Sequence, residues 1–517
     1  MTDMTPMIGR RSPCSEWPTP CGPARQRLAR WRSAGLALAA GLALAAGLAV
    51  VDRPTRADEP AGGLVARPWK LEAIEFEDGR RLEGLVVAPD NVAGTPSHDA
   101  ADIEFVQVVR PPGRPMHLVA WPAFGAASVR FVDRLVPRER EILRERVEAF
   151  RKGRRRQDEV AAVPLVRQGQ DGPWRYDSAD FQLLSTADPS LTREAVVRLH
   201  LAFDALATLV PPVGPAAPVA VRLCGSLAEY QEIQATLGLR LENPAFFVPE
   251  KRLLVAGSEL PALLDERRTA DDLLEQARQR HLALAAGLDQ QLRRLASDLE
   301  SLGKSPQERS EIVKRARGRA ARELEENQKQ IEAAKRANTA VVETARRLFF
   351  ERLSHEAWHA YADGRLRLTG AAGLPAWLDE GLAQVLETAP LEAGELRLDA
   401  PDPRRLARLQ QAIAANALPP IADVIAGGQE AFLGRHSGDN GLAYLAAWGL
   451  ALDLAVIRPV LSPPRIRAFT TAGDAAAVAG FETLVGMPID RYDRQWRQRI
   501  LNLRGPAVSG PAVSGPP

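Results

Sequence analysis

Residues 355–359 read His355-Glu356-Ala357-Trp358-His359, and Leu378-Asp379-Glu380-Gly381 follows shortly after. On a helix, residues four apart share one face, so the two histidines can bind one metal ion together. Glu356 lies next to the first histidine, where it can act as general base on a water molecule that the metal activates. Glu380 is placed to supply a third ligand. Three protein ligands with one open position are typical of a catalytic zinc site.

The surrounding sequence supports a metal site over a solvated helix face that carries these residues by accident. The chain has only seven histidines in 517 residues, so a chance H-E-x-x-H is rare. Pro375 suits the first turn of a helix, and Trp377, Leu378 and Leu382 give that helix an apolar face. The segment after Pro375 is therefore predicted to be a packed helix that carries Glu380.

The motif His355-Glu356-x-x-His359 followed by Trp377-Leu378-Asp379-Glu380-Gly381-Leu382-Ala383 resembles the gluzincin metallopeptidases. The likeness is greatest to their peptidase-MA-like branch. The resemblance implies an α+β, thermolysin-like fold and a peptide or protein as substrate. It also implies Zn²⁺ bound by the two histidines and Glu380, with Glu356 as the general base.

The resemblance extends beyond the metal motif, from about Phe181 to Trp496. Phe181–Thr186 and Asn243–Val255 resemble the strands that precede the metal helix in that group. In gluzincins an edge strand beside the zinc pairs with the extended substrate backbone. The segment Tyr444–Trp448 resembles a downstream helix, which makes Tyr444 a candidate oxyanion donor, with a buried structural tyrosine as the alternative.

Four further residues are candidates for supporting the metal ligands. Thermolysin-type members carry an aspartate four residues after the glutamate ligand, whereas this chain has Gln384, whose carbonyl is a weaker partner for an imidazole N–H. Asp363 and Asp379 lie near the ligands in sequence, although solvent-facing carboxylates are commoner. His436, in a glycine-flanked loop, is a second candidate for the oxyanion donor.

Composition excludes some classes of protein. The net charge is +2, and without residues 1–57, which carry +5, the rest carries −3. This balance argues against a nucleic-acid-binding protein. Cys14 and Cys21 lie in the first segment, so Cys224 alone would remain in a processed chain, where it reads as a buried core thiol.

The N-terminus has the pattern of an export signal, with a basic stretch before an apolar run over residues 34–51. Thr55-Arg56-Ala57 offers small residues for cleavage, so residues 1–57 are predicted to be a signal peptide. Because the run is near the minimum length of a membrane span, an uncleaved membrane anchor is the alternative. Either interpretation places the protein outside the cytoplasm, in the periplasm or the extracellular space.

The rest of the chain divides into segments of different character. Alternating apolar residues predict a small antiparallel β module over 64–136, and a charged helical linker follows over 137–175. Residues 176–505 form the expected metallopeptidase domain, and the Pro-Ala-Val-Ser-Gly repeats of 506–517 predict a disordered tail.

A long helical hairpin is expected as an insertion at about 265–345. Leucines recur at three- and four-residue spacing on either side of a break at Gly303-Lys304-Ser305-Pro306, which predicts an antiparallel coiled coil. The second helix is predicted to run straight into His355. The hairpin is interpreted as a structural arm, with a substrate gate or a self-association surface as alternatives. His281 falls on its apolar seam and reads as a packed histidine.

Two interpretations from other classes compete with the peptidase. The chain could be a non-catalytic exported scaffold or binding protein with a vestigial metal site, or a membrane-anchored binding module. Glu356 argues against the first, because a purely structural site has no use for a base at that position.

Overall fold

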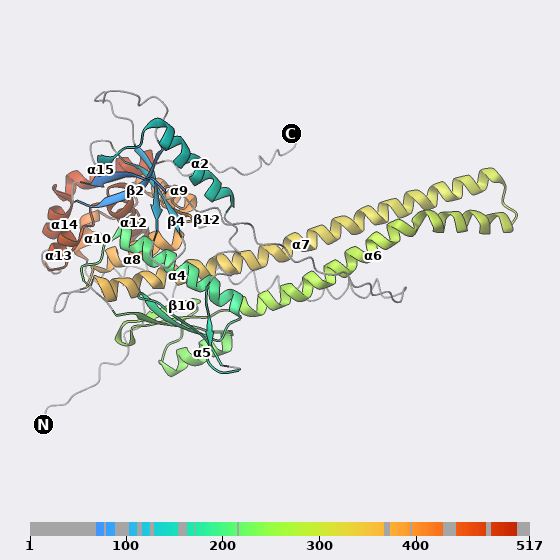
Figure 1. Cartoon of the computed structure of the whole chain (residues 1–517), viewed down its shortest axis with the longest axis horizontal. Coiled ribbons are helices and arrows are strands. Elements are labelled where there is room, and N and C mark those ends of the chain that lie inside the picture. The colour runs from blue at the N-terminus through green and yellow to red at the C-terminus, as the bar shows by residue number, and fades with distance from the viewer. Residues whose placement is uncertain are drawn as a thin grey trace. The chain divides into compact units, whose positions relative to one another are not determined.

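Two β-sheets, a group of C-terminal helices and a long helical hairpin make up the computed structural model of this chain (Figure 1). From Leu71 onward the chain forms one compact unit. The α+β class is confirmed, and the thermolysin-like arrangement stays an expectation. The predicted signal segment and the C-terminal tail lie outside the described residues, which are 69–76, 79–87, 103–110, 116–124, 129–153, 163–170, 172–214, 217–366, 373–392, 395–427, 441–471 and 477–503.

The first sheet contains the predicted β module but extends beyond it. Its strand order is β12-β13-β4-β3-β2-β1-β5. Strands β1 to β5 pair antiparallel as expected, and β13 then adds to β4 in parallel, with Leu396 opposite Val119. The added strand covers what would otherwise be an open sheet edge. The module therefore shares its sheet with a segment that follows the metal motif. The strands are β1 Glu72–Phe76, β2 Arg81–Val87, β3 Ile103–Val109, β4 His117–Phe124, β5 Val129–Asp133, β12 Leu391–Glu392 and β13 Glu395–Arg397.

The charged segment after the module is packed rather than a solvated linker. It forms helix α2 (Pro137–Gly153), whose apolar side is buried. Arg140 Nη2 donates to the buried Glu72 Oε1 at 2.7 Å, and Arg151 donates twice to Glu395, at 2.7 and 2.9 Å. These ion pairs attach α2 to β13 and β1, the strands next to the two edge strands of the first sheet.

The second sheet has the order β10-β11-β9-β8-β7-β6. Strands β6 and β7, at one edge of this sheet, begin in the segment 137–175, which was expected to be a linker. Strands β8, β9 and β11 run parallel, and β10 returns antiparallel to β11 through the predicted hairpin to form one edge. The helix α4 (Pro189–Leu209) is capped by Asp188 and packs on α7. The strands are β6 Val166–Arg167, β7 Trp174–Asp177, β8 Phe181–Ser185, β9 Val219–Leu223, β10 Ala245–Val248 and β11 Leu253–Ala256.

The predicted hairpin consists of α6 (Leu260–Ser301) and α7 (Pro306–Arg365). Gly303 takes a left-handed conformation at the turn, and Ser305 forms a capping box with Glu308. With 60 residues, α7 is about 90 Å long and runs without a break from the turn into the metal motif. Both helices extend beyond the other elements of this unit (Figure 1).

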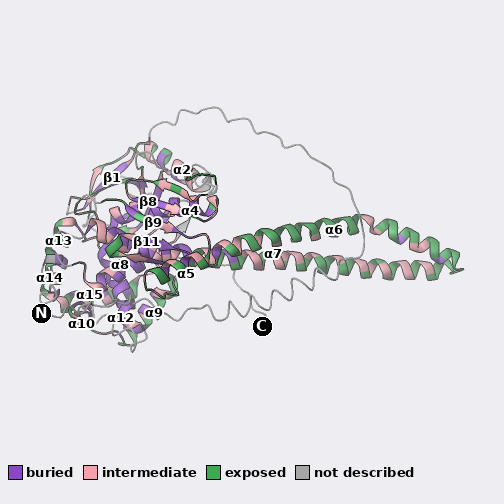
Figure 2. Ribbon diagram, turned by 90° about the horizontal axis from the view of Figure 1, so that it is seen from below, coloured by how far each residue is buried: buried purple, intermediate pink, exposed green. Residues whose placement is uncertain are grey.

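The seam between α6 and α7 differs in part from the expected one. Leu292 and Leu299 are buried in it. On the second helix the apolar spacing predicts Val341 and Leu348 in the seam, but these are exposed and their neighbours Val342 and Phe349 are buried. The difference arises where α7 enters the rest of the molecule and packs against α4 as well as α6. Most of the arm is exposed or half-buried, in contrast to the other elements (Figure 2).

The C-terminal helices close over the helix that carries Glu380. Helix α8 (Ala376–Thr388) lies against both α7 and α12. The remaining elements are α5 Leu227–Thr236, η3 Pro249–Lys251, α9 Pro403–Ala414, α10 Ile421–Ala426, α12 Leu442–Leu452, the π-helix η5 Asp453–Ile457, α13 Pro463–Thr471, α14 Ala477–Val485 and α15 Ile489–Asn502.

Gly381 allows α8 and α12 to approach closely, and its replacement should destabilise the protein. A Cβ at Gly381 would lie 2.5 Å from the Ala447 carbonyl oxygen, which belongs to the backbone and cannot rotate away. We expect Gly381→Ala to lower the free energy of unfolding by about 1–3 kcal/mol, measured by thermal or urea denaturation. Gly318→Ala is the control, since a Cβ there meets nothing within 4 Å and alanine favours helix. Equal stability of both variants would contradict the close contact.

Candidate metal centre

Helices α7 and α8 bring the three predicted metal ligands together. His355 Nε2 lies 3.7 Å from Glu380 Oε2, and His359 Nε2 lies 3.8 Å from Glu380 Oε1. One ligand atom from each of the three residues lies within 4.8 Å of the others. His355 and Glu380 are buried, and His359 is partly buried. The convergence follows from the helical spacing of the histidines and from the packing of α8 across α7.

The geometry and chemistry of this group fit a zinc ion. Bonds of about 2.0–2.2 Å in a tetrahedral site place ligand atoms about 3.4 Å apart, close to the observed 3.7 and 3.8 Å. His355 Nε2 is buried and has no hydrogen-bond partner among the described residues, which is costly unless a ligand satisfies it. The carboxylates of Glu356, Asp379, Glu380 and Glu387 gather here with the guanidinium groups of Arg352 and Arg405, so the local charge favours a bound cation.

The other nitrogen of each histidine is held by a carboxylate. His355 Nδ1 lies 2.9 Å from Glu387 Oε2, and His359 Nδ1 lies 3.2 Å from Asp379 Oδ2. Asp379 is oriented in turn by Trp358 Nε1, which donates to Oδ1 at 2.7 Å. A carboxylate on the far nitrogen fixes the ring and makes it a better metal ligand. Both Nε2 atoms are thereby presented to Glu380.

The pKa values of these groups reflect their mutual charges. Burial disfavours charge on His359, but the carboxylate of Asp379 outweighs it and raises the pKa of His359 to about 10. Burial likewise disfavours charge on Glu387, yet the hydrogen bond and charge of His355 hold the pKa of Glu387 at about 2. Metal ions bind deprotonated imidazole, so an ion that binds His359 must displace a proton.

Glu356 lies on the same helix, and both of its carboxylate oxygens have partners. Arg352, one turn earlier on α7, places Nη2 2.6 Å from Oε1. The backbone N–H of Phe247 donates to Oε2 at 2.9 Å. Phe247 belongs to β10, so this hydrogen bond joins the open edge of the second sheet to the metal helix.

The supporting residues differ from those expected. Gln384 does not hold either histidine of the site. Its Oε1 accepts a hydrogen bond from Arg405 Nη1 at 2.9 Å, and it is Glu387 that contacts His355 Nδ1. Asp363 Oδ2 lies 3.9 Å from Arg252 Nε, and Asp379 Oδ2 lies 3.2 Å from His359 Nδ1, so of these two aspartates it is Asp379 that contacts a histidine of the site.

Of the two candidate oxyanion donors, one lies within the described residues. Tyr444 is buried in the first turn of α12, on the same side as Ala447, whose carbonyl faces Gly381 beside Glu380. His436 lies outside the described residues.

Three functional candidates emerge from the structure alone: Glu387, Arg352 and Phe247. Glu387 had a sequence signal, since it follows Glu380 by seven residues and so lies on the same face of α8. Arg352 is four residues before Glu356 and had a comparable signal. No sequence pattern indicated that the N–H of Phe247 would meet Glu356, because the two are joined only by packing of β10 on α7.

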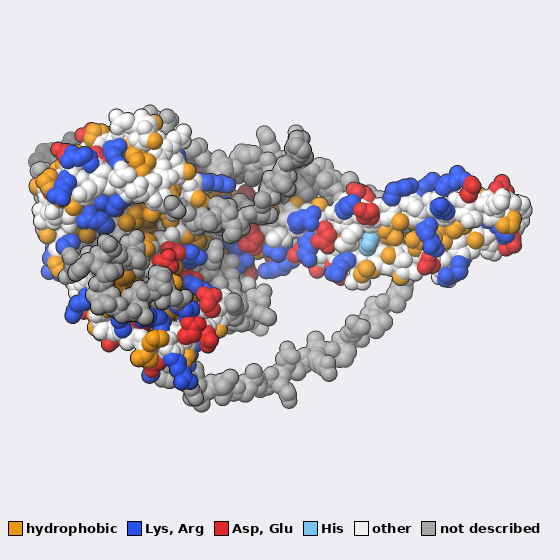
Figure 3. Space-filling model, turned by 90° about the horizontal axis from the view of Figure 1, so that it is seen from above, with side chains coloured by type: hydrophobic (Ala, Val, Ile, Leu, Met, Phe, Trp, Pro, Cys, Tyr) orange, Lys and Arg blue, Asp and Glu red, His pale blue; other side chains and the backbone are white. Residues whose placement is uncertain are grey.

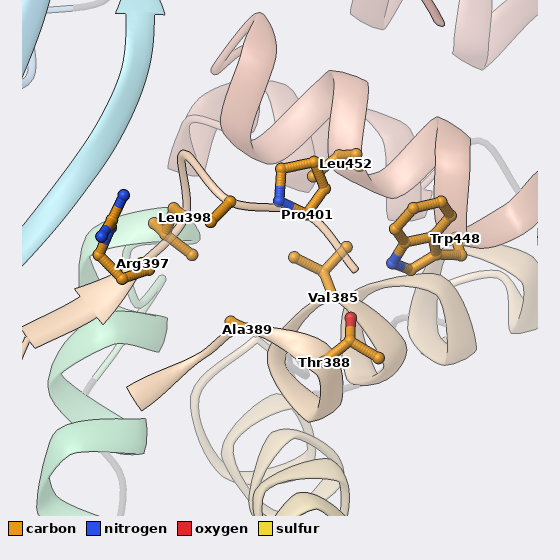
Figure 4. A pocket seen from close by; sticks show the side chains of 9 residues that line it. Val385, Thr388, Ala389, Arg397, Leu398, Pro401, Trp448 and Leu452 are labelled. Carbon is orange, nitrogen blue, oxygen red and sulfur yellow. The ribbon is translucent and has the colours of Figure 1, made fainter. Parts of the chain in front are cut away.

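A small cavity near the C-terminal end of α8 is separate from the metal ligands. Its volume of about 10 Å³ has room for one water molecule. The side chains around it come from α8, α12 and the segment after β13, including Thr388, Pro401 and Trp448 (Figure 4). Trp448 Nε1 is buried without a hydrogen-bond partner, so a structural water suits this cavity better than a substrate does.

Comparison with known proteins gives no assignment of this chain. No protein-family model matches the sequence, and no curated protein is significantly similar to it. Function is therefore argued from the site itself.

Proposed function

We propose that this chain is an exported, gluzincin-like, zinc-dependent peptidase. The convergence of His355, His359 and Glu380 around one position, with Glu356 beside them on the same helix, carries the proposal. One carboxylate beside the Nδ1 atom of each histidine supports the proposal further, because this arrangement suits histidines that bind a metal through Nε2. A structural zinc site would need a fourth protein ligand and no base.

The proposed chemistry is hydrolysis of a peptide bond. Bound zinc would polarise the scissile carbonyl and lower the pKa of a water molecule to about 7. Glu356 accepts the proton of the attacking water and passes it to the leaving amine. Tyr444 is the proposed donor to the oxyanion. Asp379 and Glu387 hold the two imidazole rings in place throughout.

Strand β10 is the proposed binding edge for an extended peptide. It is the last strand of its sheet, and the N–H of Phe247 points away from β11 toward Glu356. A peptide that adds to this edge gains backbone hydrogen bonds with little demand on sequence. It would also take over the N–H of Phe247 and free one oxygen of Glu356 for proton transfer.

Metal content and peptide hydrolysis test the proposal. We expect the purified chain to hold one zinc per molecule and to hydrolyse casein or a peptide library. Removal of zinc with a chelator should abolish hydrolysis, and added Zn²⁺ should restore it, measured by elemental analysis and product formation. The chelated chain should keep its circular dichroism spectrum. A chain without bound metal, or hydrolysis that survives complete removal of zinc, would contradict the proposal.

A non-catalytic exported scaffold with a vestigial metal site is the second candidate. The observation in its favour is that Arg352 and Phe247 occupy both oxygens of Glu356, which leaves the base engaged. A scaffold would bind zinc and hydrolyse nothing, so stoichiometric zinc without activity separates the two candidates.

Export is proposed on the N-terminal sequence, whose residues 34–51 lie outside the described residues. Within the portion that the structure describes, no helix is long and apolar enough to cross a membrane.

A further inference from the structure

The middle of the arm carries an apolar band that no other described residue covers. Residues 281–288 of α6 contain no charged side chain, and all five residues 282–286 are exposed. Leu282 is 50% exposed and Leu284 46%. Hydrophobic side chains gather midway along the arm in Figure 3. A helix segment that is apolar all round is normally covered on more than one side.

We propose that a second copy of the chain covers the face of this band that carries Leu282 and Ala286, with the two α6 helices antiparallel about a two-fold axis that passes between these two residues, at the level of residue 284. Such an interface uses the same surface on both molecules. On one face of α6, Leu282 of each copy would lie against Ala286 of the other. The band lies near the middle of α6, so the tip of each arm would reach the base of the other. The proposal does not depend on the metal centre.

The charged residues on either side of the band are complementary to those of a second copy of the chain in this register. Glu275 and Arg293 are equally far from residue 284 along α6. They are about five helical turns apart, so they lie on the same face of the helix, which is also the face of Leu282. Antiparallel pairing brings Glu275 of one copy to Arg293 of the other, twice per dimer. One more oppositely charged pair, Arg268 with Glu300, is centred on the same point, and Arg278 lies within one residue of this register from Asp289.

These side chains are available to a partner. Glu275, Arg278, Asp289 and Glu300 are exposed and make only surface ion pairs within the chain, such as Glu275 with Arg278 at 3.7 Å. Exposed ion pairs contribute little, so exchanging partners costs little. Their gain in a dimer comes from several charges paired together along about 50 Å of helix.

A groove on the same face supports the register. It has a volume of about 430 Å³ and runs between α6 and α7 in the distal half of the arm, where Arg293 and Arg309 line it. In the proposed dimer the segment opposite is 268–275 of the partner. The groove is also lined by Glu300, which pairs with Arg309. The opposing segment carries Glu275 against Arg293 and Arg268 against Glu300, so opposite charges meet along the groove.

Charge reversal with rescue tests the dimer in the full chain. We expect analytical ultracentrifugation to show a dimer for the wild type. Glu275→Arg or Arg293→Glu alone should raise the dimer dissociation constant at least tenfold, because like charges would then face each other twice. The double variant Glu275→Arg/Arg293→Glu should restore dimerisation. The two positions are about 27 Å apart within one chain, so restoration cannot come from an internal contact.

Arg322→Glu is the matched control, since Arg322 lies two residues before Leu324 and faces away from α6. It should leave the dimer unchanged, and all variants should keep the helical content of the wild type. As a second readout, Leu282→Cys/Ala286→Cys, in a chain in which Cys14 and Cys21 are replaced by serine, should form a disulfide-linked dimer on oxidation. The remaining native Cys224 is buried and does not compete. A monomeric wild type, or single and double reversals that associate equally, would overturn the proposal.

Discussion

Glu356→Gln should reduce peptide hydrolysis by about 10²–10⁴-fold while the protein keeps its zinc. Transfer of a proton by a positioned carboxylate contributes a factor of this size, and a glutamine amide cannot accept the proton. The zinc content should persist because Glu356 is not one of the three ligands. The change preserves shape, and the amide oxygen can still accept the N–H of Phe247. Initial rates on one peptide substrate, with zinc content from the same preparation, check both expectations.

Glu343→Gln is the control for this experiment. Glu343 lies on the same helix, half exposed and distant from the ligands in sequence, so its replacement should leave both rate and zinc unchanged. If the wild type holds stoichiometric zinc and yet is no faster than Glu356→Gln, the peptidase is excluded and the scaffold is favoured.

Glu387→Gln should weaken zinc binding by about 10–100-fold, the usual effect of losing a carboxylate that supports a histidine ligand. Glu387 holds Nδ1 of His355 at 2.9 Å, and its low pKa, about 2, keeps it ionised at neutral pH. A glutamine in its place loses the negative charge that makes the ring a stronger ligand. Competition with a chromogenic chelator measures the change in the zinc dissociation constant.

Gln384→Met provides the comparison that separates the two candidate partners of His355. Gln384 bonds to Arg405 and not to the imidazole, so we expect its replacement to change zinc affinity far less than Glu387→Gln does. A larger effect at Gln384 than at Glu387 would contradict the observed arrangement and favour the one expected from the family resemblance.

Features that depend on local spacing were predictable from the sequence. His355 and His359 share a face of α7 because of helical periodicity, and α7 runs into them without a break as expected. The turn at Gly303–Ser305 was also predictable, since glycine, serine and proline act on the backbone within a few residues. The position of Glu380 beside both histidines agrees with the ligand set that the resemblance implied.

Features that depend on the choice among nearby partners were not predictable. Gln384 and Glu387 lie within one turn of each other on α8, and the spacing of either permits contact with His355. Arg405 of α9 binds Gln384 and lies 3.7 Å from Glu387, so packing of another helix selects which side chain reaches the ring. Helical periodicity places a residue on a face but does not choose its rotamer.

Long-range pairing accounts for the remaining differences. The strands of 72–133 were recognisable by alternation, but nothing local indicated that β13 would extend their sheet. The hydrogen bond from Phe247 to Glu356 joins residues 109 positions apart. The sequence was thus sufficient for the helix that carries both histidines and for the arm, because these follow from backbone periodicity, whereas Glu380 meets the histidines through the packing of α8 on α7. The partners of Glu356, His355 and β4 depend on segments that meet only after folding, since no local pattern encodes which surfaces pack together.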